Sequence, residues 1–364
     1  MIGERTLKIL ILGGTGAMGA YTSSLLAEKG NEVTITTMRS ILDTRHIHYL
    51  HGNAHDIRFM TPVLEQHWDL IIDFMLYQFK EFKERVDKFL GATNRYVFLS
   101  SARVYAESDE PISEDFPRLL DVCTDNSYLA TEEYALAKAR EENLLINNSR
   151  KNWIIIRPYI TYADQKLQLG VYEKENWLYR VLHDRTLVFP SDISQHVTTL
   201  TYGYDVAKIL LELSTKRDAE GEIFNIACNT TIHWSDVLTI YQETLKTVIG
   251  KILKVKMLDN SNTIYAVMRN KYQVRFDRLF NRIFNSSKVE SILGHPINFT
   301  PPSKGLRDCL TTFLTRKIPF KELSVRLEAY QDFITHEYTC ISEFTTMRQR
   351  LSYIARRYLG YQMP

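Results

Sequence analysis

The chain has 364 residues, and its 45 basic side chains are nearly balanced by 43 acidic ones, which gives a net charge of +2. This balance provides no electrostatic argument for a nucleic-acid or membrane partner, and we expect neither. Hydrophobic residues at 45% and charged residues at 24% are ordinary for a globular protein and argue against long disordered stretches.

The cysteines and the apolar runs narrow the class of protein further. The four cysteines lie far apart and form no CxxC pair, so the sequence indicates neither a zinc site nor a disulfide framework. No apolar run reaches the roughly 20 residues of a membrane span, and the run after Thr6 is too short for the core of a signal peptide. We therefore expect a cytoplasmic protein with reduced thiols.

Short apolar runs alternate with helical stretches through the first half of the chain. The runs expected to be strands are Lys8–Leu12, Val33–Thr37, Tyr49–His51, Leu70–Phe74, Tyr96–Ser100 and Trp153–Arg157. The stretches expected to be helices are Ala17–Lys29, Ile57–Gln66, Phe79–Leu90 and Ser127–Asn148. Continuously apolar strands suit a parallel sheet that is covered on both faces. The alternation predicts an α/β fold with a Rossmann-type doubly wound sheet and ligands at the carboxyl ends of its strands.

The second half is less regular and predicts a smaller, mixed lobe. Its clearest elements are a strand at Ile223–Ile226 and helices at Tyr204–Leu213 and Trp234–Leu245. One helical face in the tail is formed by Leu323, Leu327, Tyr330, Phe333 and Ile334. We therefore expect a dinucleotide-binding domain over 1–165 with further core elements around 195–230, a substrate lobe over 166–315, and a helical extension over 316–364.

A glycine-rich loop follows the first strand directly and opens the first helix. In Gly13-Gly14-Thr15-Gly16-Ala17-Met18-Gly19, the first glycine permits a tight turn, Gly16 lets the backbone approach a pyrophosphate, and Gly19 allows close packing of the helix on the sheet. The unpaired N–H groups at the start of the helix face the anion. Strand, loop and helix in this order predict a dinucleotide site formed by Gly13, Thr15, Gly16, Ala17, Met18 and Gly19.

The end of the second strand bears on the choice of cofactor. Arg39 and Ser40 stand where an NAD enzyme usually carries an acid for the ribose 2′-hydroxyl. A guanidinium suits a 2′-phosphate, so NADP is favoured and NAD stays possible, although Arg39 could also be a solvated strand-end charge. Asp56 and the adjoining Ile57 follow the third strand, where the carboxylate could accept from the adenine amino group or cap a helix.

Four histidines, His46, His48, His51 and His55, precede Asp56. They alternate along a strand and lack an evident acidic partner, so we interpret them as surface histidines or histidines at the rim of the cofactor site, and we propose no metal.

Tyr134 and Lys138 are four residues apart, on one face of a predicted helix. A phenol with an ordinary pKa near 10 exchanges protons poorly at neutral pH, and a nearby ammonium favours its phenolate form. The strand before this helix ends in Ser100-Ser101, at the carboxyl edge of the sheet. There, Ser101 could hydrogen-bond a substrate oxygen beside the phenol. The spacing alone is common, so the prediction depends on the glycine loop and the serine.

Together these motifs resemble the extended short-chain dehydrogenase/reductase family, in its branch of nucleotide-sugar epimerases, reductases and dehydratases. The resemblance covers nearly the whole chain and includes Arg157-Pro158 and the segment Gly221–Ile226. It implies that Ser101, Tyr134 and Lys138 are catalytic, that Lys138 also holds the nicotinamide ribose, and that Phe74 and Pro158 line the cofactor site. It also implies a nucleotide-sugar substrate and a homodimer.

Two departures from the family pattern bear on the reaction. The fourth strand ends Asp73-Phe74-Met75-Leu76, where many members of the family have H-x-A-A. The chain therefore resembles a divergent branch of the family. Ala102-Arg103 stand where sugar dehydratases carry an acid pair, which disfavours dehydration. We therefore expect an NADP(H)-dependent reductase of a nucleotide-activated keto sugar, with a 4-keto-6-deoxyhexose favoured.

Two alternatives stay open at this point. The first is a nucleotide-sugar 4-epimerase with tightly bound NAD, and the second is a non-catalytic, nucleotide- or RNA-binding relative of the fold. Arg185, Arg275 and Lys288 are candidate contacts for a sugar diphosphate, although each could equally be an ordinary surface charge.

Overall fold

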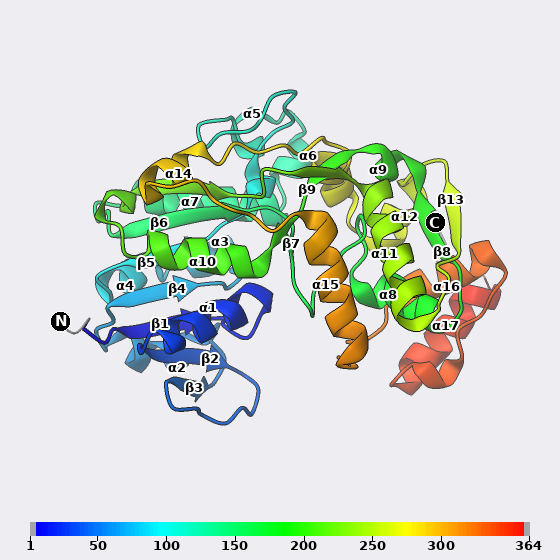
Figure 1. Ribbon diagram of the computed structural model, residues 1–364, viewed down its shortest axis with the longest axis horizontal. Helices are drawn as coiled ribbons and strands as arrows, with labels where there is room; N and C mark the ends of the chain where they lie inside the picture. The colour runs from blue at the N-terminus through cyan, green and yellow to red at the C-terminus, as the bar shows by residue number, and fades with distance from the viewer. Residues whose placement is uncertain (1–4, 360–364) are drawn as a thin grey trace.

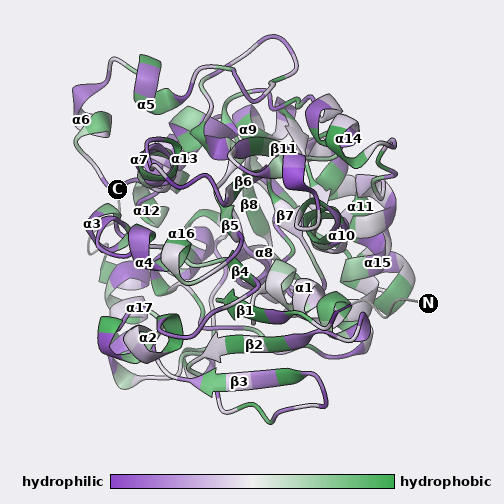
Figure 2. Cartoon of the chain, turned by 90° about the vertical axis from the view of Figure 1, so that its left-hand side faces the viewer, coloured by the Kyte–Doolittle hydropathy of each residue, from purple (hydrophilic) through white to green (hydrophobic). Residues whose placement is uncertain are grey.

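Seven strands form one parallel sheet in the computed structural model, which describes residues 5–359. They are β1 (Lys8–Leu12), β2 (Glu32–Thr37), β3 (Ile47–His51), β4 (Leu70–Asp73), β5 (Tyr96–Leu99), β6 (Trp153–Pro158) and β11 (Glu222–Ile226). Their order is β11-β6-β5-β4-β1-β2-β3, which Figure 2 shows from top to bottom. Every neighbouring pair is parallel. The predicted doubly wound α/β fold is confirmed, with β1 inside the sheet and the chain winding away from it in both directions.

Alternate residues of the strands point to opposite faces of the sheet, and both faces are covered by helices. Ile9 and Ile11 pack on one side while Leu10 and Leu12 pack on the other, and all four are fully buried. The first face is covered by α1 (Ala17–Glu28), α10 (Gly203–Leu213) and α14 (Ser287–Leu293). The second face is covered by α2 (Ile57–Leu64), α3 (Phe79–Lys83), α4 (Val86–Gly91) and α7 (Tyr134–Ile146). Burial on both sides explains why these strands are continuously apolar.

Two predicted helices are each divided in two. The stretch Phe79–Leu90 becomes α3 and α4, and Ser127–Asn148 becomes α6 (Asn126–Leu129) and α7. In the second case the Glu133 carboxylate accepts a hydrogen bond from the backbone N–H of Ala135 at 2.8 Å and so caps a new helix. Such local side-chain bonds compete with helix continuation. As a consequence, Tyr134 is the first residue of α7.

The second lobe is built from small sheets and helices around its own core. Its strand pairs are β7 (Thr161–Tyr162) with β10 (Thr201–Tyr202), β8 (Leu187–Pro190) with β13 (Val255–Leu258), and β9 (Val197–Thr199) with β12 (Thr231–His233). Its helices are α8 (Lys174–Leu182), α9 (Ser191–Gln195), α11 (Trp234–Ile249), α12 (Asn262–Met268), α13 (Lys271–Gln273) and α15 (Pro302–Thr315), and short α5 (Leu119–Val122) follows β5. Because α10 and β11 return to the large sheet, the chain crosses between the lobes more than once. The boundaries at 165 and 315 stay predictions.

The tail contains α16 (Val325–Thr335) and α17 (Met347–Leu359), which lie at the right-hand end of the molecule in Figure 1. Leu323, Leu327 and Tyr330 of the predicted helical face are buried, and Ile334 packs against the core of the second lobe. Phe333 is 51% exposed, so its assignment to that face was wrong. It lies one residue from Ile334, about 100° around a helix, and therefore turns away from the lobe.

Candidate active site

The glycine loop has the geometry that its sequence predicts. Gly13 has a φ of +70°, a conformation that side chains rarely adopt, and a Cβ on Gly19 would lie 2.6 Å from the Cα of Gly14. Gly14, which the sequence reasoning passed over, is equally constrained because its Cβ would lie 2.8 Å from the side chain of Ile11. The first turn of α1 has neither a side-chain cap nor an acidic residue. Its N–H groups are therefore suited to an anion.

A hollow of about 1070 Å³ lies in front of this loop. Thr15, Gly16 and Ala17 line it from the loop, and Arg39 lines it from the end of β2. Arg39 is exposed, as is Ser40 beside it, and the backbone N–H of Arg39 donates to the Thr37 hydroxyl at 3.0 Å. Residues of the second lobe and of the tail form the opposite walls. The hollow is thus placed and sized for a dinucleotide.

Asp56 is engaged as the N-cap of α2. Its carboxylate accepts from the backbone N–H of Arg58 at 2.9 Å and pairs with the Arg58 guanidinium at 2.8 Å, which lowers the pKa of Asp56. The next residue, Ile57, starts the helix and is half-buried. The capping role of Asp56 is therefore established, whereas an adenine contact for either residue stays a prediction.

A second hollow, of about 330 Å³, brings together the two predicted catalytic hydroxyl groups. Ser101 follows β5 and caps a 3₁₀ turn by accepting from the backbone N–H of Arg103, while Tyr134 begins α7. Both residues line this hollow, together with Met18, Phe74 and Pro158. Leu76 and Lys166 line both hollows. The glycine loop and the hydroxyl groups therefore line two adjoining hollows.

Arg103 is the cation that stands over the tyrosine. Its guanidinium lies 5.2 Å from the centre of the Tyr134 ring, pairs with Glu133 at 2.6 Å and lies 3.4 Å from Asp277. Burial alone would lower the pKa of Arg103, but Asp277 and Glu133 outweigh it and the pKa is raised. The side chain is thus held as a permanent cation in the hollow. The sequence reasoning used Arg103 only to argue against dehydration.

Lys138 is buried below the tyrosine, on the next turn of α7. Its ammonium donates to the carbonyl of Met75 at 3.2 Å, pairs with Glu141 at 3.0 Å and lies 4.4 Å from the centre of the Phe98 ring. Burial raises the pKa of Glu141 to about 7, against the opposing effect of Lys138. Lys138 is therefore held by a buried carboxyl group, and its action on Tyr134 stays a prediction.

Two further cations in the second hollow were missed from the sequence. Lys166 and Arg278 both line it, and burial, together with the nearby charges of Arg278 and Lys321, lowers the pKa of Lys166. Arg278 pairs with Asp277 and donates to the carbonyl of Gly170 at 3.0 Å. No local motif marks either residue, because segments distant in sequence bring them together.

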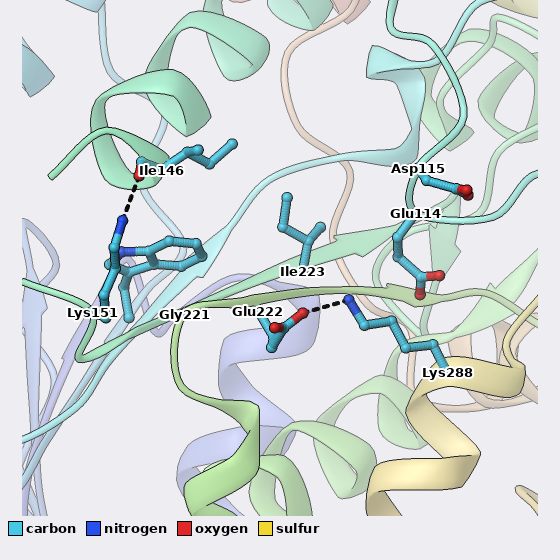
Figure 3. Close-up of a pocket in the computed structure, with 9 residues that line it drawn as sticks. Glu114, Asp115, Ile146, Lys151, Gly221, Glu222, Ile223 and Lys288 are labelled. Atoms are coloured by element: carbon cyan, nitrogen blue, oxygen red, sulfur yellow. Dashed lines mark hydrogen bonds and ion pairs between the residues drawn. The ribbon is translucent and has the colours of Figure 1, made fainter.

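The cations suggested from the sequence lie elsewhere. Arg185 pairs with Glu343 of the tail at 2.9 Å, and Arg275 pairs with Asp125 at 2.8 Å. Lys288 pairs with Glu222 at 2.7 Å in a separate cavity of about 400 Å³, where Figure 3 shows the two side chains directed toward each other. We therefore withdraw these three residues as contacts for a sugar diphosphate at the site of Ser101 and Tyr134.

The histidine cluster does have acidic partners, contrary to expectation. His46 and His48 bond to Glu32 at 3.0 and 3.1 Å, across neighbouring strands, and His55 bonds to Glu81 at 2.9 Å. Pairing between strands is invisible in a linear sequence, which explains the error. Among residues 5–359, no group of three or more histidine, cysteine or acidic side chains is arranged to hold a metal ion.

The fold of this chain is shared with solved structures of an epimerase, a 4,6-dehydratase and a 4-epimerase. One structure with this fold is an epimerase from Methanothermobacter thermautotrophicus, with a TM-score of 0.67 and 17% identity over 86% of this chain and 95% of that one. The UDP-glucuronic acid 4-epimerase of Bacillus cereus, in complex with UDP-glucuronic acid and NAD, has a TM-score of 0.65 and 16% identity over 86% and 100%. The dTDP-glucose 4,6-dehydratase of Bacillus anthracis, in complex with NAD, also gives 0.65, with 15% identity over 86% and 98%.

The sequence comparisons give a different kind of relative. The chain is 26% identical over 238 residues to the chloroplast stem-loop binding protein of 41 kDa b from Arabidopsis thaliana. The match covers 60% of this chain and 58% of that protein, so it spans little more than half of the relative's length. No model of a known protein family matches the sequence. The name of the relative weakens our expectation that nucleic acid is not a partner.

None of the helices between residues 5 and 359 combines the length and the apolar character needed to cross a bilayer.

Proposed function

We propose that this protein reduces a keto group of a nucleotide-activated sugar with NADPH. The observation that carries the proposal is that Ser101 and Tyr134 line one hollow, which adjoins the hollow lined by the glycine loop. A bound nicotinamide would supply the hydride. The chain supplies the groups that orient the carbonyl and move the proton.

Tyr134 gives its phenolic proton to the oxygen of the substrate carbonyl as that oxygen becomes an alkoxide. Ser101, in the same hollow, donates a hydrogen bond to the same oxygen. The Arg103 guanidinium lies 5.2 Å from the centre of the ring, and Lys138, one helical turn away, is a second cation, on the same helix as the tyrosine. Arg103 stands where dehydratases carry an acid, and this supports reduction over dehydration.

The substrate class is inferred from the cations of the second hollow. Lys166 and Arg278 line it, and a diphosphate in this hollow would lie close to both positive charges. Two of the structurally similar enzymes are named for UDP-glucuronic acid and dTDP-glucose, which are sugars linked to a nucleotide through a diphosphate. We infer a nucleotide diphosphate sugar, with a 4-keto-6-deoxyhexose favoured.

The choice of NADPH rests on Arg39, which lines the first hollow. The similar structures hold NAD, so this step goes beyond them. An Arg39→Ala variant is expected to lose its preference for NADPH over NADH in binding titrations. Arg45→Ala removes an exposed cation from the same loop and provides the control. An Arg39→Ala protein with an undiminished preference for NADPH would overturn the assignment.

The reaction itself is tested by following the absorbance of NADPH with a panel of 4-keto nucleotide sugars. We expect Tyr134→Phe to lower turnover about 10²- to 10⁴-fold while cofactor binding is kept. Tyr338→Phe, at a side chain that is 71% exposed, is the matched control. Near-normal turnover by Tyr134→Phe would exclude this tyrosine as the acid.

A 4-epimerase is the second candidate, because structurally similar proteins are named as epimerases and one holds a nucleotide sugar with NAD. Ser101 and Tyr134 can serve either reaction. An epimerase would purify with bound NAD and would turn over without added NADPH, which a net reductase cannot do.

Binding of a stem-loop nucleic acid is the third candidate, and the named relative alone supports it. It predicts a salt-sensitive mobility shift with a stem-loop RNA. A shift that survives Tyr134→Phe would show that binding and reduction are separate properties.

We also propose that the chain forms a homodimer, as the resemblance implies. Light scattering on the purified protein should give twice the monomer mass of 42.5 kDa.

A further inference from the structure

The segment that links α15 to α16 crosses the front of the first hollow. Its residues Ile318 to Ser324, which we call the strap, have no regular secondary structure, and all seven line the hollow opposite the glycine loop and Arg39. Figure 1 shows α15 between the two lobes, with the chain continuing from it to α16 and α17 at the far end. The tail thus reaches a site that the first lobe had been expected to form mainly by itself.

The strap is fixed at several points by its own side chains and backbone. The ring of Phe320 meets Tyr179 and Phe313 edge-on, with centroids 5.2 and 5.1 Å apart. Leu323 is buried with Phe344 and Tyr353. These contacts fix the position of the strap, because Phe320 and Leu323 anchor it on either side of Lys321.

Lys321 stands between the anchors with its charge toward solvent. Its backbone N–H donates to the Glu175 carboxylate at 3.0 Å, and that carboxylate is already paired with Lys174 at 2.5 Å. Glu322, the next residue, accepts a hydrogen bond from Gln349 of α17. Neither carboxylate forms an ion pair with the ammonium of Lys321, since Glu175 pairs with Lys174 and Glu322 bonds to an amide.

Three cations from three separate parts of the chain line this hollow without forming an ion pair among the described residues. They are Arg39 after β2, Lys166 from the second lobe and Lys321 from the strap. Glu173, Glu175 and Glu322 line the same hollow, and Glu173 opposes the lowering of the pKa of Lys166. A bound anion would further offset the repulsion between the three cations. The start of α1, at Gly16 and Ala17, adds the partial positive charge of a helix N-terminus to the same space.

We propose that the strap is a wall of the cofactor site, and that the ammonium of Lys321 pairs with a phosphate of the bound dinucleotide. This inference rests on the proposed function, since it assumes that NADP or NAD occupies the hollow. The tail is then part of the binding site, and its packing against the second lobe positions Lys321 for contact with the cofactor.

The test measures the affinity of NADP⁺ and NAD⁺ by titration calorimetry for the wild type and three variants. Lys321→Ala should weaken dinucleotide binding about 5-fold, and Lys321→Glu more than that, with a smaller loss at high salt. The matched control is Lys29→Ala, an exposed lysine that follows the other end of α1 and should leave affinity unchanged. Lys321 is exposed, so both variants should keep the melting temperature of the wild type.

A second measurement is independent of any substitution. Hydrogen exchange of residues 318–324 should slow when NADP⁺ is added to the wild-type protein. If the wild type binds dinucleotide while Lys321→Ala matches Lys29→Ala and exchange in the strap is unchanged, this inference alone fails. If the wild type binds neither NADP⁺ nor NAD⁺, the proposed function fails with it.

Discussion

One buried ion cluster of the protein lies behind the candidate active site, and another lies in the tail. They have opposite ratios of guanidinium groups to carboxylates. Behind Ser101, the Glu142 carboxylate receives Arg157 through two contacts of 2.7 Å and Arg118 at 3.1 Å. In the tail, Arg180 is shared between Glu328 and Asp332, both at 2.8 Å. One carboxylate has two guanidinium partners in the first cluster, whereas one guanidinium is shared by three carboxylates in the second, since Glu337 also lies 3.2 Å from Arg180.

The pKa values follow this ratio. Burial alone would raise the pKa of Glu142, but Arg157, Ser100 and Arg118 outweigh it and the pKa is lowered. For Glu328 burial outweighs Arg180, and the pKa is raised. Equal burial therefore does not imply equal stabilisation. Folding favours the ionised form of Glu142 in the cluster behind the candidate active site. In the tail cluster, folding disfavours the ionised form of Glu328.

Removing the negative charge of Glu142 should have the largest effect. We expect Glu142→Gln to lower the free energy of unfolding by about 3–5 kcal/mol, because Arg157 and Arg118 lose a buried counter-ion. Turnover should fall as well, since Glu142 accepts from Ser100, the neighbour of Ser101, at 2.5 Å. Urea titration at neutral pH measures the first effect, and substrate turnover the second.

The sign of the pH dependence gives a further check on Glu142. Because its folded pKa is lowered, the stability that it contributes is present above the ordinary carboxyl value of 4.5 and is lost as the pH falls through the folded pKa. The difference between wild type and Glu142→Gln should therefore shrink in acid. Glu132→Gln, at a side chain that is 55% exposed, is the control and should cost less than about 1 kcal/mol. A similar loss in both variants would contradict the special role of the cluster.

Glu141, the sequence neighbour of Glu142, shows what happens to a buried carboxyl group with a single cation. Its folded pKa of about 7 lies above the ordinary 4.5, so ionisation destabilises the fold progressively as the pH rises through that window. Relative to Glu141→Gln, the wild type should lose on the order of 3 kcal/mol between the two ends of the window. Melting temperatures of both proteins measured across this window provide the test. A difference that does not change with pH would show that Glu141 titrates normally.

The fold was predictable because its signal is local. Continuous apolar runs such as Lys8–Leu12 follow from burial on both faces of the sheet, and the glycines of the first loop from backbone geometry. The paired strands of the second lobe were mostly missed. They are as short as the two residues Thr161–Tyr162, and they pair with segments far along the chain, so no periodicity can develop in them.

The site was predictable to the same extent. Ser101 and Tyr134 belong to motifs that carry a family resemblance, and the structure places both in one hollow. Lys166 and Arg278 line that hollow and Lys321 lines the first one, but none of the three carries a local pattern, because only the folded chain brings them there. The break before Tyr134 had a signal in Thr131 and Glu133, whose side chains form local capping bonds, but the helical composition around them concealed it.

A hydrogen bond in the tail cluster should have an intermediate effect. The Tyr353 hydroxyl donates to Asp332 at 2.6 Å and accepts from the backbone N–H of Thr339 at 2.7 Å. Tyr353→Phe should cost about 1–3 kcal/mol, because both buried partners lose a bond. Thermal unfolding measures the loss, and Tyr358→Phe, at a side chain that is 62% exposed, is the control. An unchanged melting temperature for Tyr353→Phe would mean that the tail does not unfold with the rest of the chain.

Glu328→Gln is the smallest expected effect and the sharpest test of the comparison. Arg180 keeps Asp332 and also Glu337 at 3.2 Å, and one Glu328 oxygen is buried without a hydrogen-bond partner. Removing a charge that burial already disfavours should change the free energy of unfolding by less than about 1 kcal/mol at neutral pH. The same substitution at Glu142 is expected to cost several times more. Equal losses measured by urea titration would contradict this comparison. They would show that burial alone, and not the ratio of cations to carboxylates, decides how much each cluster contributes to the free energy of unfolding.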